Sequence, residues 1–360
     1  MKLTLKIKLL PSDAQALYLL NTIKEANSAC NAISEIAWSN RVFQQFKLHG
    51  ICYYGIKDSF SLSSQVVVRC ISKVVDSYKI DKKSKRSFHP LGAIAYDSRI
   101  ISYKKDLVSI STIDGRVKIP FICHNTKYIP YIKGEADLVY KKDKFYLFQT
   151  VEIPDVEIED IEEFIGVDFG LTDIAVTSDG AKHSAEWLNQ YREKRQNIRS
   201  SLQRKGTRGA RRLLKRLKGK EKTTATIINH TISKSIVESA KSQGKGIAIE
   251  DLTGIRFTSK RRSKKFRIKL GRWGFHQLRC FLEYKSKLNG VKLIVVDPAY
   301  TSKTCSCCRH IGKRNNKSFK CENCGNDIDS DVNASINIAT LGAVISQPEK
   351  SEMYSCAVHF

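Results

Sequence analysis

Two pairs of cysteines constrain this chain more than any other feature. Cys305 and Cys308 stand in a CxxC spacing, and Cys321 and Cys324 repeat it after residues 309–320. Two such turns facing each other supply four thiolates, which hold Zn²⁺ tetrahedrally and leave no open coordination position. The spacing therefore predicts a zinc ribbon around one structural zinc ion.

Two nearby residues leave the ligand set open. Cys307 could replace a neighbouring cysteine as a zinc ligand, although a CxC spacing makes a poorer turn. His310 is a weaker alternative ligand. The intervening sequence RHIGKRNNKSFK is basic, and we expect it to solubilise a surface loop rather than bind phosphate. The total of 11 cysteines is odd, and most of the others lie in apolar patterns, which favours a reducing compartment.

The charge balance indicates a partner that carries many negative charges. Lys and Arg number 62 against 36 Asp and Glu, so the formal net charge is +26. So high a positive charge offers little advantage to a metabolic enzyme. It strengthens the binding of a protein to nucleic acid, because each phosphate contact releases condensed counterions. A ribosomal or membrane-surface protein is the alternative. No apolar run approaches the ~18 residues of a membrane span, and no signal peptide is evident, so we expect a cytoplasmic protein.

Two stretches concentrate this charge. Residues 192–222 carry 14 basic and 2 acidic side chains, a net of 14 − 2 = +12, and predict one or two helices broken near Gly206–Gly209. Residues 256–272 hold nine basic side chains and no acidic one, and predict a loop. We expect both to bind nucleic acid rather than only to face solvent. The candidate contacts are Arg211, Arg212, Lys215, Arg261, Arg262, Lys264 and Lys265.

The N-terminal segment changes its periodicity twice. Residues 2–9 alternate with period two and predict a strand. Ser12 and Gln15 then form a capping-box pattern, which predicts a long helix through about residue 47. Residues 63–78 predict a second helix, although their β-branched run also fits a strand.

Shorter elements follow. Alternating segments across residues 92–152 favour a small β-barrel or curled sheet, which the first strand joins. The run DVEIEDIEE at 155–163 is strongly acidic in so basic a chain and predicts a linker between domains. After it, FIGVDFGLTDIAVTSDG predicts a β-hairpin, and GKGIAIE and VKLIVV predict buried strands.

Three acids stand at the edges of these elements. Asp168 lies in the first hairpin strand, Glu250 ends GKGIAIE, and Asp331 opens a helix. A carboxylate beside buried apolar residues is costly unless a positive partner meets it, and hard divalent cations are such partners. Singly, each acid is more simply a cap or an ion-pair member. Three carboxylates from three elements can also hold two metal ions that activate water against a phosphodiester.

Taken together, these segments resemble a known family. IGVDFGLTDIAV, GIAIEDL and DSDVNASINIA resemble the three split motifs of RuvC-type, RNase H-like nucleases. The cysteine segments TSKTCSCC and FKCENCG, placed between the second and third motifs, resemble the TnpB family of transposon-encoded proteins, which is related to the type V CRISPR effectors. SSQVVVRCISKV and PLGAIAYDSRI are also similar, so the resemblance covers nearly the whole chain apart from its tail.

The resemblance implies an α+β multidomain fold, in which an N-terminal β-barrel with an inserted helical module precedes an RNase H-like (RuvC) α/β domain carrying an inserted zinc ribbon. The expected parts are a barrel domain at 1–10 and 85–154, a helical recognition module at 11–84, a linker at 155–163, a RuvC-like domain at 164–300 and 325–343, a ribbon at 301–324, and a tail at 344–360.

The resemblance also implies an activity. Family members are RNA-guided endonucleases that need Mg²⁺ or Mn²⁺, take a guide RNA derived from the element, and cut double-stranded DNA next to a short target-adjacent motif. Asp168, Glu250 and Asp331 match the first, second and third catalytic carboxylates. Asp329 competes for the third role, and Asp327 has none.

The helix expected at 63–78 takes the place where the family contacts its DNA motif. Its candidate base contacts are Ser64, Gln65 and Arg69. Arg309 departs from the pattern, because many relatives have glycine after the first CxxC pair. The intact acids argue against a catalytically silent, guided DNA-binding protein, which is the main alternative, and a strand-transfer transposase or transposase-accessory protein is a further one.

Overall fold

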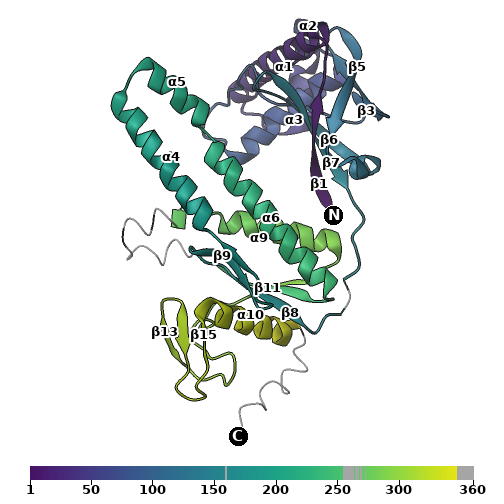
Figure 1. Cartoon of the computed structure of the whole chain (residues 1–360). Coiled ribbons are helices and arrows are strands. Elements are labelled where there is room, and N and C mark those ends of the chain that lie inside the picture. Colours follow the sequence, from purple (N-terminus) through teal and green to yellow (C-terminus); the bar gives the residue numbers. More distant parts are fainter. Residues whose placement is uncertain (159, 254–262, 264–266, 268–269, 272, 347–360) are drawn as a thin grey trace. The chain divides into compact units, whose positions relative to one another are not determined.

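The computed structural model describes residues 1–158, 160–253, 263, 267, 270–271 and 273–346 (Figure 1). The chain forms two compact units, the first spanning Met1–Pro154 and the second beginning at Asp155. The candidate contacts outside the described residues are Arg261, Arg262, Lys264 and Lys265. The tail from residue 347 onward is outside them too. No helix in the described part is long and apolar enough to cross a membrane.

The helices of the first unit follow its first strand. They are α1 (Asp13–Ser39), α2 (Gln45–Ser59) and α3 (Ser64–Ile80). The capping box is confirmed, because Ser12 and Gln15 each bond the other's backbone N–H. The expectation of one helix through residue 47 is wrong. α1 ends earlier because Arg41 takes a left-handed φ of 53° and the Val42 N–H bonds back into the last turn, which closes the helix.

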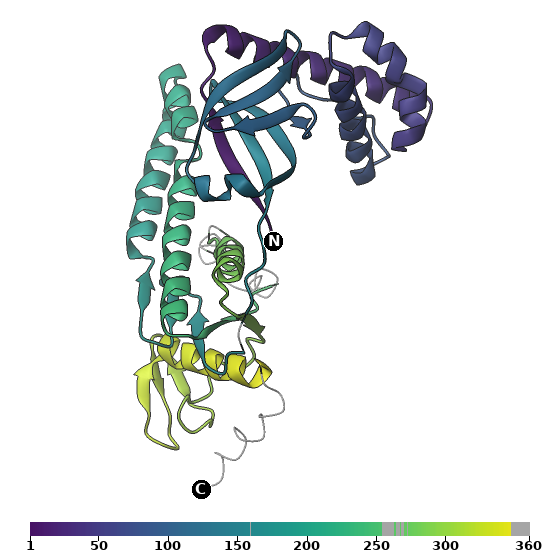
Figure 2. The same cartoon turned by 90° about the vertical axis from the view of Figure 1, so that its right-hand side faces the viewer.

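The strands of the first unit form one antiparallel sheet. They are β1 (Lys2–Leu9), β2 (Ile94–Tyr96), β3 (Ile101–Lys104), β4 (Leu107–Thr112), β5 (Gly115–Cys123), β6 (Ile132–Lys141) and β7 (Lys144–Glu152), in the order β2-β6-β7-β1-β5-β4-β3. The short 3₁₀ helix Thr126–Tyr131 precedes β6. β1 lies in the middle, between β5 and β7, as expected for a strand that joins the later segments. The sheet is curled and nearly closed (Figure 2). Across the gap, Tyr96 of the edge strand β2 donates its hydroxyl to the Ser111 carbonyl of β4 at 3.0 Å.

The second unit is built on a mixed sheet. Its strands are β8 (Phe164–Asp168), β9 (Asp173–Thr177), β10 (Lys182–Ser184), β11 (Gly246–Glu250) and β12 (Leu293–Val296), in the order β10-β9-β8-β11-β12. The hairpin prediction is confirmed by the antiparallel pairing of β8 with β9. β8, β11 and β12 run parallel, with Val167 opposite Ile249. This register brings the carboxyl ends of β8 and β11 to the same edge of the sheet.

The described helices of the second unit are α4 (Glu186–Lys205), α5 (Arg208–Leu217), α6 (Lys220–Ser242), α9 (Phe275–Asn289) and α10 (Ser330–Ser346). Three of them cover the two faces of the sheet. α6 and α9 pack on the face that carries Ile247 and Ile249, whereas α10 packs on the opposite face, against Ala248. Gly166 permits the close approach of α10, because a Cβ there would lie 1.9 Å from the Ser335 carbonyl oxygen.

The basic segment 192–222 is helical and broken where the sequence predicts. Gly206 ends α4 with a φ of 63°, and the Thr207 side chain caps α5 by accepting from the Ala210 N–H. α5 then leads into α6 through Gly219, which has a φ of 85°. These three helices form an arm that projects from the sheet of the second unit (Figure 1).

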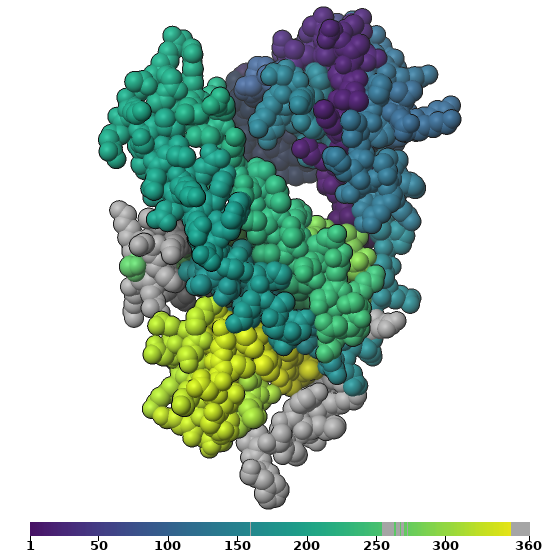
Figure 3. All heavy atoms as spheres, in the orientation of Figure 1, coloured from purple at the N-terminus to yellow at the C-terminus, as the bar shows by residue number. Residues whose placement is uncertain are grey.

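A small three-stranded sheet lies between β12 and α10. It contains β13 (Lys313–Asn315), β14 (Ser318–Lys320) and β15 (Asp327–Asp329). The cysteine-bearing segment therefore extends past the expected boundary at 324, and α10 runs past the expected boundary at 343. Asn333 and Asn337 of α10 both donate to the Thr304 carbonyl beside the first cysteine pair, at 2.8 and 2.7 Å, so the cysteine-bearing segment packs directly against α10 (Figure 3).

Candidate metal centres and nucleic-acid interface

The four paired cysteines converge at one point. The sulfur atoms of Cys305, Cys308, Cys321 and Cys324 all lie within 4.8 Å of one another. The distances are 3.6 Å from Cys305 to Cys324 and 3.5 Å from Cys308 to Cys321. Cys307 is exposed and lies outside this cluster. Four thiols at this spacing are a donor set that suits zinc.

The local backbone prepares these sulfurs for a metal. The Arg309 N–H donates to the Cys305 carbonyl at 3.1 Å, and the Gly325 N–H donates to the Cys321 carbonyl at 3.0 Å. Each of these closes one cysteine turn. A hydrogen bond from the backbone N–H of His310, and next one from the Asn323 side chain, lower the pKa of the Cys308 thiol to about 5. The thiolate, which is the metal-binding form, is therefore favoured at Cys308.

Arg309 explains how the first turn tolerates the absence of glycine. Its φ is 64°, a left-handed value close to the 72° of Gly325 in the second turn. The guanidinium donates to Asn337 at 2.7 Å and to Thr340 at 3.1 Å, both on α10. These bonds offset the backbone strain and fasten the turn to the helix that also carries Asp331.

The three acids come from β8, β11 and the first turn of α10. The parallel register sets Asp168 and Glu250 at neighbouring strand ends, and α10 crosses the same edge with Asp331. Burial, followed by repulsion from Glu250 and Asp331, raises the pKa of Asp168 to about 7. Burial also raises the pKa of Glu250, which accepts a hydrogen bond from the Thr301 hydroxyl at 2.5 Å. The three carboxylates therefore belong to one electrostatic cluster.

Asp329 has a different place. Its Oδ1 accepts from the backbone N–H groups of Asp331 and Val332, at 2.9 and 3.3 Å, so it caps the start of α10. Its Oδ2 pairs with Lys182 at 2.7 Å. The repulsion that raises the pKa of Asp168 comes from Glu250 and Asp331, and Asp329 is not among its causes.

The acids differ in how their charge is compensated. Asp331 is paired with Arg314 at 3.1 Å and with Lys317 at 2.5 Å, both from the segment between the cysteine pairs. Within the described part of the chain, no side chain donates to or pairs with the Asp168 carboxylate.

The expectation that RHIGKRNNKSFK only solubilises a loop is wrong for Arg314 and Lys317. Sequence reasoning missed both because nothing local marks a contact with an acid on another element.

The acidic cluster suits hard cations by the chemistry of its donors, which are all oxygens. Among the described residues, only the four cysteines form a group of three or more Cys, His, Asp or Glu side chains whose ligand atoms are close enough to bind one ion. Within the described residues, Asp168, Glu250 and Asp331 do not form such a group.

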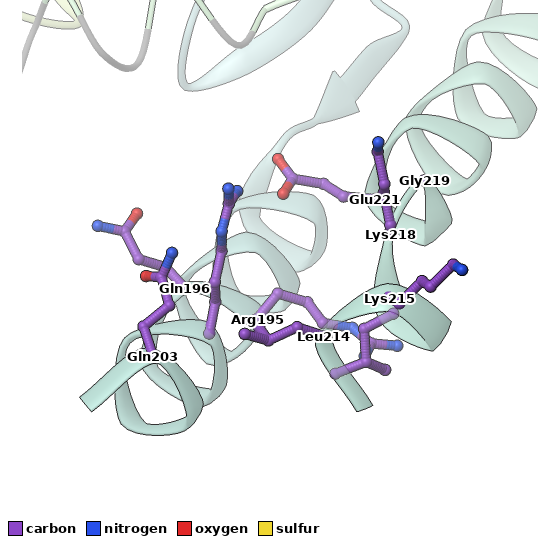
Figure 4. Close-up of a pocket in the computed structure, with 10 residues that line it drawn as sticks. Arg195, Gln196, Gln203, Leu214, Lys215, Lys218, Gly219 and Glu221 are labelled. Atoms are coloured by element: carbon purple, nitrogen blue, oxygen red, sulfur yellow. The ribbon is translucent and has the colours of Figure 1, made fainter. Parts of the chain in front are cut away.

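A basic cleft lies between α4 and the α5–α6 connection (Figure 4). Its volume is about 490 Å³. It is lined by Arg195, Gln196, Arg199, Gln203, Leu214, Lys215, Leu217, Lys218, Gly219 and Glu221. Of the predicted contacts, Lys215 lines the cleft, whereas Arg211 and Arg212 are exposed on α5 outside its lining. Cations along a cleft with apolar walls are typical of a phosphate-binding surface.

The candidate base contacts on α3 are mostly engaged within the first unit. Gln65 bonds Asp97, and Arg69 pairs with Glu135. Ser64 is exposed at the start of the helix. Base contacts by Gln65 or Arg69 would therefore need these side chains to leave their acidic partners.

The chain resembles known proteins in sequence and in fold. The family model described as "Cas12f1-like, TNB domain" matches residues 275–338, which include all four cysteines and Asp331. The chain is 31% identical over 396 aligned residues to a CRISPR-associated endodeoxyribonuclease Cas12f1 of Sulfoacidibacillus thermotolerans, covering 88% of this chain and 90% of the relative. It is 34% identical over 169 residues to a TnpB-like protein of Methanocaldococcus jannaschii, covering 46% of this chain and 60% of that relative.

A solved structure shares the multidomain α+β fold. The protein chain of a cryo-EM structure of a Cas12f1–sgRNA–target DNA complex superposes with a TM-score of 0.59 at 15% sequence identity. The match covers 90% of this chain and 83% of that one.

Proposed function

Since the chain belongs to the TnpB family, which is related to the Cas12f effectors, we propose that it is an RNA-guided DNA endonuclease encoded by a transposable element. One observation carries the catalytic part of the proposal. Three acids from β8, β11 and α10 converge closely enough that Glu250 and Asp331 raise the pKa of Asp168. A cluster of like charges is costly to keep in a fold, and such clusters occur at functional sites.

In this proposal the sheet with its helices is a RuvC-like, RNase H-like domain. Asp168, Glu250 and Asp331 hold two Mg²⁺ or Mn²⁺ ions, and Thr301 orients the Glu250 carboxylate by its hydrogen bond. The ions supply Lewis-acid charge that activates a water and stabilises the leaving oxygen of a phosphodiester. The parallel strand register fixes the spacing of the first two acids, and Asp329 fixes the third by capping α10.

The cysteine cluster has a structural role in this scheme. Cys305, Cys308, Cys321 and Cys324 hold one Zn²⁺ and order the inserted ribbon against α10. The basic cleft on the α4–α6 arm contacts the backbone of the guide RNA or of the RNA–DNA heteroduplex. Base pairing with a guide RNA derived from the element selects the double-stranded target, beside a short motif contacted by the first unit.

The test uses the full chain purified with its co-expressed RNA. With target DNA and Mg²⁺, we expect cleavage by the unaltered protein and by the control variant Asp327→Ala, whose exposed side chain lies 4.0 Å from Lys320. Asp168→Ala should abolish cleavage while RNA and DNA binding persist. Binding without any cleavage by the unaltered protein would instead support the silent DNA-binding alternative, and joined strands would support a transposase role.

A further inference from the structure

Lys317 lies in the tight turn between β13 and β14, and this turn is held in place. Asn316 takes a left-handed φ of 53°. The buried Ser330 donates its backbone N–H to the Lys317 carbonyl at 2.8 Å and its hydroxyl to the Asn316 carbonyl at 2.9 Å. The turn is therefore tied to the start of α10, one residue before Asp331.

From this turn Lys317 reaches two carboxylates on two different elements. Its Nζ contacts Oδ2 of Asp331 at 2.5 Å and also pairs with Asp173, the first residue of β9. Arg314 contacts the other oxygen of Asp331 at 3.1 Å. Both oxygens of the third acid thus carry a cation supplied by the ribbon, whereas Asp168 has no such partner among the described residues.

We propose that Lys317 is a competitor for the metal, built into the ribbon, which occupies Asp331 until a nucleic-acid phosphate draws the lysine away. The inference rests on the proposed nuclease function and adds a residue that controls metal loading. A lysine is a compact charge on a flexible stem, so it can exchange partners without moving the turn. Asp331 cannot give the same oxygen to an ammonium group and to a divalent ion.

Three features support an exchange rather than a permanent ion pair. The Lys317 side chain is 41% exposed, so a strand entering the site can reach it. Asp173 offers a second partner beside the first, so the lysine stays close when it leaves Asp331. A phosphate that binds Lys317 weakens its hold on Asp331, and by linkage metal and nucleic acid then favour each other's binding.

The experiment measures metal binding rather than cleavage. Mn²⁺ is titrated into the zinc-loaded full chain, free of nucleic acid, and free Mn²⁺ is followed by electron paramagnetic resonance. Removal of a partly exposed competing ion pair should lower the half-saturating Mn²⁺ concentration of Lys317→Met by about fivefold. Lys320→Met on the same hairpin is the matched control, because Lys320 pairs with Asp327 instead, and it should bind like the unaltered protein.

A third variant separates this inference from the proposed function. If Asp168→Asn abolishes Mn²⁺ binding while Lys317→Met binds no more tightly than the unaltered protein, the metal site stands and the competitor role is overturned. If Asp168→Asn binds Mn²⁺ as the unaltered protein does, both ideas are overturned.

The coupling to nucleic acid is measured in the same titration. A phosphorothioate single strand that resists cleavage should tighten Mn²⁺ binding to the unaltered protein, and should do so much less in Lys317→Met. An equal effect of the strand on both proteins would contradict the exchange.

Discussion

Neutralising Asp168 should stabilise this protein when no divalent metal is bound. Burial and the neighbouring carboxylates raise the pKa of Asp168 from 3.8 to about 7 in the folded state. The folded state therefore binds this proton more tightly than the unfolded state, and folding stability falls as the pH rises between these two values. Asp168→Asn keeps the shape of the side chain and removes the charge.

The size of the effect follows from the two pKa values. A difference of about three pH units corresponds to about 4 kcal/mol, at 1.36 kcal/mol for each unit. This is an upper bound, because other charges in the cluster relax when Asp168 ionises. We therefore expect Asp168→Asn to be more stable than the unaltered protein by about 1–4 kcal/mol near pH 8, and by less than half of that near pH 5.

The assay is urea denaturation in buffers without Mg²⁺ and without chelator, so that zinc remains in place. Trp273 is a natural reporter, because it is buried and its ring lies 6.4 Å from that of Phe169, the residue after Asp168. Hydrogen exchange of the β8 and α10 peptides gives a second, local readout.

Asp251→Asn is the matched control. Hydrogen bonds from Thr253, and next one from Arg279, lower the pKa of Asp251. Its charge therefore stabilises the folded state at neutral pH, and its removal should destabilise. If Asp168→Asn gains no stability near pH 8, or gains as much near pH 5, burial and the neighbouring acids do not raise the pKa of Asp168.

Three further predictions concern the zinc site, the packing of α10 and the basic arm. Cys308→Ser should lose the single bound zinc measured by elemental analysis, whereas Cys307→Ser should retain it, because Cys307 lies outside the cluster. Gly166→Ala should destabilise the second unit by about 3 kcal/mol in urea denaturation, because of its clash with α10, whereas Gly209→Ala in α5 meets no atom and should not. Lys215→Ala should weaken binding to RNA of any sequence and should lower the salt dependence of the binding constant by about one counterion, as filter binding at several salt concentrations would show.

Much of the second unit follows from local sequence. The strands IGVD and GIAIE could be predicted from their runs of apolar residues. The two cysteine turns could be predicted from the CxxC spacing. The convergence of Asp168 with Glu250 depends on a parallel register, which the resemblance supplies and the residues alone do not.

The features that could not be predicted depend on long-range contacts. The end of α1 near Arg41 depends on one left-handed residue that any long helical pattern hides. Gln65 and Arg69 look free on a helix, yet Asp97 and Glu135 on distant segments engage them. Lys317 looks like a solvent-exposed lysine in a basic loop until the fold places it on Asp331.

The most direct test of a two-metal site at the three acids is anomalous diffraction from crystals of the protein soaked in Mn²⁺. We expect two manganese peaks among the carboxylates of Asp168, Glu250 and Asp331, separated by about 4 Å, with zinc remaining at the cysteines. Manganese bound elsewhere at saturating Mn²⁺, with none at these carboxylates, would contradict a metal site at the three acids.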